Sequence, residues 1–176
     1  PAVYAQDTRK ICIMVYDQLK LQNQLCFRLY TASRLVTQTY FPILENIGIT
    51  YPQYLVLMAL WEEDGMKVME LAHKLFLDSN TVTPLVQRMD KLGLVKREKG
   101  KVDGRETYVH LTEKGKELQE KAKDVPSCML ERILTEAMQM EDIKALSTQL
   151  DNLIDNLSEQ REQVKQAAKE ERKVRR

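Results

Sequence analysis

The spacing of apolar and polar residues changes near the middle of the chain, between residues 67 and 113. Apolar residues at positions 68, 71, 72 and 75 have helical spacing, and cap-type residues at 78–80 introduce a second helix over 81–92 that ends at Gly93. Residues 94–99 and 106–111 are strand-like, and residues 100–105 between them are typical of a turn. The pattern therefore predicts two helices joined by a turn and followed by a charged hairpin.

This order of elements is that of a winged helix-turn-helix. Such a unit fits its second helix into the major groove of DNA, while the hairpin reaches along the backbone to the neighbouring minor groove. We therefore predict a DNA-binding region over residues 50–115. Hydroxyl, amide and guanidinium groups of the second helix can contact base edges or phosphates, although an ordinary solvated face has the same composition. The candidates on this helix are Asn80, Thr81, Thr83, Gln87 and Arg88.

Charge is distributed unevenly along the chain. The net charge is +1, but residues 66–116 carry 11 basic and 7 acidic side chains, a net charge of +4, and the remainder carries −3. Positive charge is thus concentrated around the hairpin, as phosphate binding requires, though a solvated surface can show a similar excess. The candidates for sequence-independent contacts are Lys96, Arg97, Lys99 and Lys101.

Helices are also predicted on both sides of this region. Residues 19–41 carry one apolar stripe, and Pro42 predicts a kink or restart. Thr50 caps a helix that ends near Gly65, and Thr112 caps another that continues towards Asp124. Two more helical stretches cover residues 128–138 and 140–157. The predicted fold is therefore mainly α-helical with a small β wing.

The outer helices predict how two copies assemble. Two winged units need a shared platform to bind a palindrome, so we expect residues 19–49 and 116–157 to form a helical dimerisation region. An ordinary intramolecular core is the alternative. Residues 1–18 are expected to form an N-terminal extension, and the charged residues 158–176 a solvated or frayed tail.

Several classes of protein are disfavoured by the sequence. No apolar run approaches the roughly 18 residues that a membrane span needs, and no signal-peptide core is evident, so we expect a cytoplasmic protein. The cysteines at positions 12, 26 and 128 are too scattered for a secreted disulfide framework. With His73 and His110 they form no metal-ligand spacing, so we expect neither metal nor cofactor.

Cys26 lies one position away from the apolar stripe of the first helix. A free cysteine is usually a small buried hydrophobe. Tyr30 follows one turn later, and Tyr40 and Tyr51 lie further along the chain. Phenolic hydroxyls that donate to the sulfur favour the thiolate, which is the form that attacks a peroxide. The residues themselves leave both roles open.

A family resemblance favours the reactive role. The chain resembles the MarR family of transcriptional regulators and, within it, the organic hydroperoxide sensor branch. The most specific parts are the surroundings of Cys26 and the run from Thr50 to Tyr54. The matching positions are 21–27, 30, 32–34, 40, 50–57, 60–62, 77–85, 92–95, 103–105 and 111–115. The resemblance covers residues 19–157, and both ends of the chain extend beyond it.

The resemblance implies roles for particular residues. Cys26 is expected to react with peroxide, and Tyr40 and Tyr51 to hydrogen-bond its sulfur across a homodimer. Cys128 lies where two-cysteine members keep a resolving cysteine, whereas Cys12 precedes the resemblance and is expected to be a bystander. Arg105, oriented by Asp103, resembles the wing arginine that enters the minor groove.

Together these features predict a repressor rather than an enzyme. We expect it to bind palindromic operator DNA when reduced and to be released when an organic hydroperoxide oxidises Cys26. One alternative is a repressor released by a small aromatic ligand in the dimer cleft. A thiol peroxidase would use the same cysteine, but it would give no reason for a basic wing.

Overall fold

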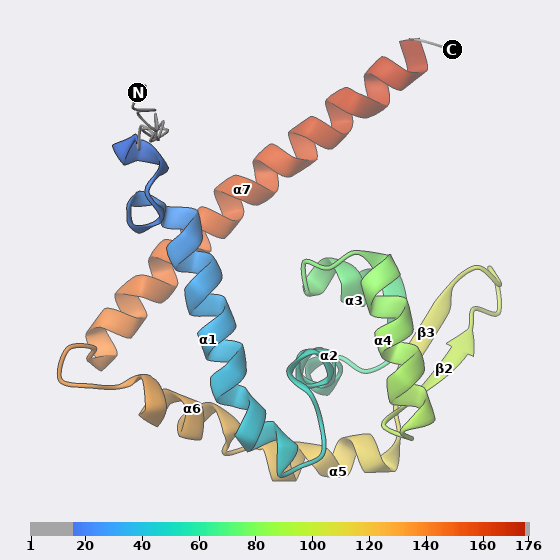
Figure 1. Cartoon of the computed structure of the whole chain (residues 1–176). Helices are drawn as coiled ribbons and strands as arrows, with labels where there is room; N and C mark the ends of the chain where they lie inside the picture. The colour runs from blue at the N-terminus through green and yellow to red at the C-terminus, as the bar shows by residue number, and fades with distance from the viewer. Residues whose placement is uncertain (1–15, 175–176) are drawn as a thin grey trace, which may run out of the picture. The chain divides into compact units, whose positions relative to one another are not determined.

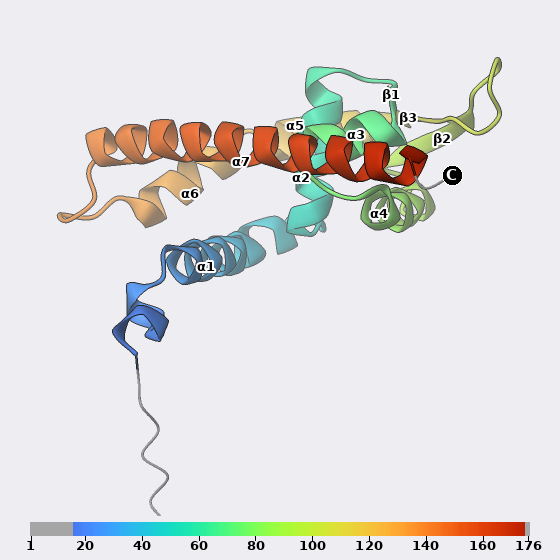
Figure 2. The same ribbon diagram turned by 90° about the horizontal axis from the view of Figure 1, so that it is seen from above.

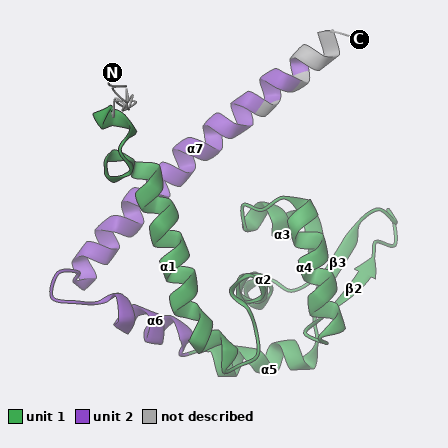
Figure 3. Cartoon of the chain, viewed as in Figure 1, with its two compact units in different colours: residues 1–123 green, residues 124–176 purple. Residues whose placement is uncertain are grey.

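The computed structural model of the chain describes residues 16–174 and is mainly helical, with one small sheet (Figure 1). The chain divides into two compact units between Lys123 and Asp124 (Figure 3). This division falls inside residues 116–157, the span predicted for dimerisation. Within the described residues, none of the helices combines the length and apolar character that a bilayer span needs.

The first unit contains most of the secondary structure. Its two short 3-10 turns and its helices and strands follow in this order: η1 Asp17–Leu19, η2 Leu21–Asn23, α1 Leu25–Glu45, α2 Tyr51–Glu62, β1 Met66–Lys67, α3 Val68–Lys74, α4 Ser79–Lys91, β2 Val95–Lys99, β3 Thr107–Leu111 and α5 Glu113–Ala122. Helix–turn–helix and hairpin are therefore confirmed, with bounds close to those predicted.

Helix α1 differs from the prediction at both ends. It begins at Leu25 rather than at residue 19, because the preceding residues form the two 3-10 turns. It also runs past Pro42 to Glu45, so the restart expected there is wrong. A proline removes one helical hydrogen bond, but here it lies in the last turn, which buried Leu44 anchors. At the other end of the helix, its first residue Leu25 is 62% exposed, so this end of the predicted apolar stripe is not buried within the chain.

The core of the first unit holds the DNA-binding elements together. Helix α2 has buried residues along most of its length, including Val56, Leu57 and Leu60, and α4 buries Val82 and Met89. The three-stranded sheet has the antiparallel order β1-β3-β2, and the loop of its β2–β3 hairpin projects beyond α3 and α4 (Figure 2). The hairpin is thus carried by a packed helical base.

Side-chain caps fix the starts of two helices as the sequence predicted. The Thr50 amide before α2 donates to Oε1 of Gln53 at 2.8 Å. Before α5, the Thr112 hydroxyl accepts from the Gly115 amide at 3.1 Å and donates to the Gly93 carbonyl at 2.6 Å. The second cap therefore ties the end of the hairpin to the end of α4.

The second unit consists of α6 Val125–Ile133 and α7 Met140–Val174. The predicted helix over 128–138 is therefore shorter and begins earlier, with Pro126 in its first turn. Residues 158–174 continue α7, so the frayed tail is wrong, although the tail side chains that the structure describes are exposed. This stretch lacks glycine and proline and is rich in Glu, Gln, Lys, Arg and Ala, which favour helix.

Candidate functional site

Helix α4 separates its apolar and polar residues onto opposite faces. Val82, Leu85, Val86 and Met89 are buried, which holds the helix against the rest of the unit. The five side chains predicted to meet DNA, Asn80, Thr81, Thr83, Gln87 and Arg88, are all exposed. A helix with this face of hydroxyls, amides and a guanidinium can contact bases and phosphates.

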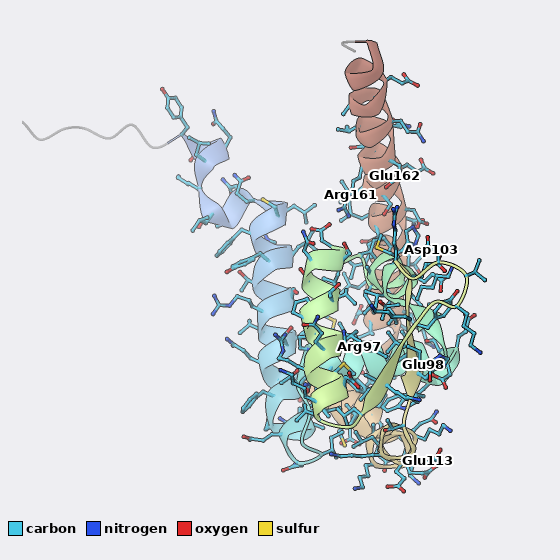
Figure 4. All side chains as sticks on the ribbon, turned by 90° about the vertical axis from the view of Figure 1, so that its right-hand side faces the viewer. Arg97, Glu98, Asp103, Glu113, Arg161 and Glu162 are labelled. Atoms are coloured by element: carbon cyan, nitrogen blue, oxygen red, sulfur yellow. The ribbon has the colours of Figure 1, made fainter. Side chains whose placement is uncertain are left out.

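The wing is the β2–β3 hairpin with its loop, residues 95–111, and it is tied to α4 by an ion pair. Nε of Arg97 on β2 lies 3.1 Å from Oδ2 of Asp90 on α4, and Figure 4 shows Arg97 where the hairpin passes beside that helix. Lys96 pairs with Glu98 on the same strand at 2.8 Å, a contact that raises the pKa of Lys96 through their hydrogen bond. Lys101 in the loop is exposed. Of these cations, Arg97 therefore also has a positioning role.

Asp103 and Arg105 lie in the wing loop as the sequence predicted. Oδ1 of Asp103 accepts a hydrogen bond from the backbone amide of Arg105 at 2.9 Å, and both side chains are exposed. The carboxylate thus fixes the backbone that carries the arginine. Between the wing and α4 lies an open pocket of about 510 Å³, whose polar lining includes Ser79, Thr83, Arg97 and Arg105. We call this pocket the wing groove.

The two cysteines within the described residues are free and exposed. Cys26 is the second residue of α1, and Cys128 is the fourth residue of α6. The exposure of Cys26 means that this chain alone does not bury it as a small hydrophobe. Tyr30, one turn later, is 58% exposed, and its hydroxyl oxygen accepts from Arg34 at 3.3 Å. Cys12 lies outside the described residues.

Tyr40 and Tyr51 lie together at the junction of α1 and α2. Their ring centroids are 4.9 Å apart, and Tyr54 lies 6.1 Å from Tyr40. Burial raises the pKa of Tyr40, and the neighbouring Tyr51 raises it further; burial also raises the pKa of Tyr51. Both phenols are therefore protonated at neutral pH and can donate hydrogen bonds.

This tyrosine pair belongs to a larger aromatic cluster that the sequence reasoning did not single out. Tyr54 contacts Trp61 with centroids 6.2 Å apart, and the Trp61 indole donates to the Gly115 carbonyl at 3.0 Å. Tyr51, Tyr54 and Trp61 are spaced by three and seven residues, which places them on one face of α2. That spacing was the available signal. The cluster connects the end of α1 to α5.

Cys26 and the tyrosine pair of one chain are far apart. Tyr40 follows Cys26 by 14 residues on the same continuous helix. At a rise of about 1.5 Å per residue, the two positions are separated by about 21 Å along the axis. A hydrogen bond between Cys26 and Tyr40 therefore requires two copies of the chain.

The structure also brings together three residues that the sequence did not indicate. Nζ of Lys67 lies 2.7 Å from Oε1 of Glu106, and Tyr108 donates to Oε2 of the same carboxylate at 3.2 Å. Lys67 and Glu106 are 39 residues apart, so no local pattern relates them. His73 is exposed and His110 half-buried. In the described part of the chain, no group of three His, Cys, Asp or Glu side chains is arranged to hold a metal ion.

Comparison with known proteins places this geometry in a family. A family model described as transcriptional regulator SarA/Rot matches residues 38–122. The organic hydroperoxide resistance transcriptional regulator of Bacillus subtilis is 42% identical over 142 residues, which are 81% of this chain and 95% of that protein.

Solved structures show the same similarity. The structure of reduced AbfR bound to DNA is 36% identical, covers 80% of this chain and 95% of that chain, and has a TM-score of 0.65. The structure of disulfide-formed AbfR is 37% identical over 81% of this chain and 94% of that chain, with a TM-score of 0.57. AbfR is a protein of Staphylococcus epidermidis. Because the identity of 42% extends over nearly the whole Bacillus subtilis regulator, the chain belongs to the MarR family of transcriptional regulators.

Proposed function

We propose that the protein is a homodimeric repressor that binds palindromic operator DNA when reduced and is released when an organic hydroperoxide oxidises Cys26. The observation that carries the proposal is the separation, by about 21 Å along α1, of the exposed Cys26 thiol from Tyr40, which packs against Tyr51. The relative named as an organic hydroperoxide resistance regulator supports it. Since its ligand is DNA, we assign the protein to the cytoplasm.

DNA binding is assigned to α4 and the wing. In each protomer the exposed face of α4 would enter the major groove, and Arg105 on the wing loop would reach the minor groove. Lys96, Lys99 and Lys101 would supply attraction to phosphates that does not depend on sequence. Two such units, held at a fixed spacing by the dimer, would match the two halves of a palindrome.

The dimer would be formed by the outer helices. Apolar side chains of α1 such as Leu25 and Leu35 are exposed in the single chain, as are Leu146 and Leu157 of α7. Association of two copies would cover this surface and bring Cys26 of each within reach of the partner's tyrosine pair. We therefore assign residues 19–49 and 116–157 to dimerisation.

Oxidation would proceed in two steps. The Cys26 thiolate attacks the terminal oxygen of ROOH, the O–O bond breaks, and the products are Cys26 sulfenic acid and an alkoxide that takes up a proton to form ROH. The Cys128 thiol can then attack the sulfenic sulfur, forming a disulfide and releasing water. Each protomer consumes one peroxide per oxidation and does not turn over continuously, so the protein is a sensor and no enzyme.

The structure offers a route from the sulfur to the DNA surface. Tyr51 is the first residue of α2, and the buried face of α2 packs in the same core as the buried face of α4. Loss of the sulfur–phenol hydrogen bonds would shift α2 and with it α4, which changes the spacing of the half-sites. A coupling of about 3 kcal/mol would weaken operator binding about a hundredfold.

Release of a fluorescent operator tests the proposal. The probe is a duplex that the wild-type protein selects from a random-sequence pool, measured at fixed salt with and without cumene hydroperoxide. We expect wild type to be released and Cys26→Ser to stay bound. Cys128→Ser is the matched thiol control. It should also be released, but it cannot form the disulfide with Cys26 from which a reductant would restore DNA binding. Release of Cys26→Ser to the same extent as wild type would instead favour a repressor controlled by a small aromatic ligand.

A further inference from the structure

Lys67 is the central residue of a small ionic network at the base of the wing. It is the last residue of β1 and pairs in register with Tyr108 of β3. Its Nζ lies 2.7 Å from Oε1 of Glu106 and 5.6 Å from the centroid of the Tyr108 ring. The remaining carboxylate oxygen of Glu106 accepts from the Tyr108 hydroxyl. Residues from β1 and from the start of β3 thus meet at one carboxylate.

Glu106 also closes the wing loop through its backbone. Its carbonyl accepts from the Gly100 amide at 2.9 Å, and its amide donates to the Asp103 carbonyl at 3.1 Å. The next residue towards the tip is Arg105. The ion pair between Glu106 and Lys67 therefore holds the end of the loop that carries Arg105.

The same residues line the wing groove, where DNA phosphates would approach. Lys67 and Glu106 contribute to its lining together with Ser79, Arg97 and Arg105. A carboxylate at this place would repel a phosphate unless a cation neutralised it. The hydrogen bond from Lys67 to Glu106 raises the pKa of Lys67, so the ammonium group is charged when DNA binds. Because Lys67 pairs with Glu106 and Arg97 with Asp90, the positive charge that the groove lining offers to a phosphate is that of Arg105.

We propose that Lys67 is a wing-positioning residue: it binds and neutralises Glu106, so that the wing loop is held in place and the wing groove accepts a phosphate. The charge of Lys67 is then neutralised by Glu106 within the protein, and Lys67 does not contact a phosphate. The proposal rests on the proposed function because it presumes that the groove faces DNA. The ion pair between Lys67 and Glu106, which we call the clamp, can be tested without DNA.

The first test measures the clamp in free protein. Amide hydrogen exchange of Gly100 and Glu106 is compared by NMR in wild type, Lys67→Gln and Lys116→Gln. The control removes the same charge from an exposed pair on α5, in which Lys116 lies 2.9 Å from Glu113. We expect faster exchange of the Gly100 amide in Lys67→Gln alone. Unchanged exchange in Lys67→Gln would overturn the proposal, whether or not the protein binds DNA.

The second test is a double-mutant cycle of operator binding over a range of salt concentrations. Lys67→Gln should bind more weakly than wild type, because Glu106 is left unpaired in the groove. Adding Glu106→Gln should recover part of that loss, and the double variant should keep the wild-type salt slope. If Lys67 instead binds a phosphate, the double variant stays as weak as Lys67→Gln and its slope falls by about 0.9.

Unfolding must be excluded as the cause of weaker binding. Thermal unfolding of each variant is measured alongside, and the rate at which Cys26 reacts with cumene hydroperoxide gives a second measure of a folded protein, remote from the wing. A variant that keeps the wild-type unfolding temperature and the wild-type rate of Cys26 oxidation but loses operator binding is folded, and its wing is displaced. Lys67→Arg keeps the ion pair and should restore both the exchange protection and the affinity; failure of this rescue would contradict the clamp.

Discussion

A sensor of this kind depends on the protonation of a few side chains. The proposed attack of Cys26 on peroxide needs a thiolate, and a hydrogen-bond donor beside a sulfur favours that form. Tyr40 and Tyr51 can serve as donors because burial raises their pKa and keeps the phenols protonated at neutral pH. The packing of the pair against Tyr54 thus bears directly on its chemistry.

The raised tyrosine pKa values predict how stability depends on alkaline pH. The pKa of Tyr40 in the folded chain lies above 10.0, the ordinary tyrosine value at which the unfolded chain loses the proton. Its contribution to stability is therefore complete below that value and is lost as the pH rises through the folded pKa. Denaturant unfolding at about pH 9 and about pH 11 should show a smaller decrease for Tyr40→Phe than for wild type. Equal decreases would contradict this assignment.

Gly115 predicts a second effect at a single residue. A Cβ built on Gly115 would lie 2.1 Å from the Leu94 carbonyl oxygen and 3.2 Å from Cδ2 of Leu111. Backbone must therefore move to admit alanine, and we expect Gly115→Ala to lower the free energy of unfolding by about 1–3 kcal/mol. Gly104→Ala is the control, since nothing lies within 4 Å of its Cβ. Urea titration measures the free energy of unfolding of both variants. Equal values would contradict the prediction, because they would mean that the backbone admits the extra methyl group without cost.

Elements whose pattern is local were predictable from the sequence, and those set by distant contacts were not. Helix α4 and the hairpin were predicted within a few residues because caps, apolar spacing and Gly93 mark their ends. The start of α1 was placed too early because the apolar stripe continues into residues that form 3-10 turns. For the tail, charge alone suggested fraying, whereas strong helix formers continue α7.

The candidate site shows the same limit. The exposed face of α4 could be named from its helical pattern, whereas Cys26 and the wing arginine were named from the family resemblance. The Lys67–Glu106 pair joins residues on different elements, and Asp90–Arg97 joins α4 to the wing. Such pairs follow from the tertiary packing of the strands and helices, which no short pattern reports.

Helix α4 and the wing loop should differ in what they contribute to DNA binding. Gln87→Ala removes a side chain that can read a base edge, so it should cost about 1–3 kcal/mol and relax preference at one base pair. Lys101→Gln should weaken binding to all sequences and lower the salt slope by about 0.9. Anisotropy titrations with operator and scrambled duplexes distinguish the two. If the base preference of Gln87→Ala were unchanged, Gln87 would not be a residue that contacts a base.

The proposed function requires two copies of the chain. One chain separates Cys26 from its own tyrosine pair and leaves apolar side chains of α1 and α7 exposed. The proposed dimer would answer both observations, since it would cover the apolar surface and complete each sensing site with groups of the partner. Peroxide sensing and half-site spacing would then depend on the same interface.

The dimer predicts the effect of a substitution on α7. Leu157 is 54% exposed in the single chain, so Leu157→Lys should not lower the stability of the chain itself. If the second copy covers it, the substitution should weaken the dimer by about 1.5–3 kcal/mol, roughly tenfold or more. Sedimentation over a range of concentrations measures this, with Glu159→Lys as the control. A wild-type dimer constant in Leu157→Lys would exclude this face from the interface.

Redox control of operator binding is tested by measuring the oxidation of Cys26 and the release of DNA in the same samples. Wild-type protein bound to its operator is titrated with cumene hydroperoxide without reductant, and each sample is divided between anisotropy and peptide mass analysis of Cys26. We predict that the released fraction of operator follows the oxidised fraction of Cys26 and that release is complete at about one peroxide per protomer. Operator released while Cys26 remains reduced, or retained when Cys26 is fully oxidised, would contradict the account.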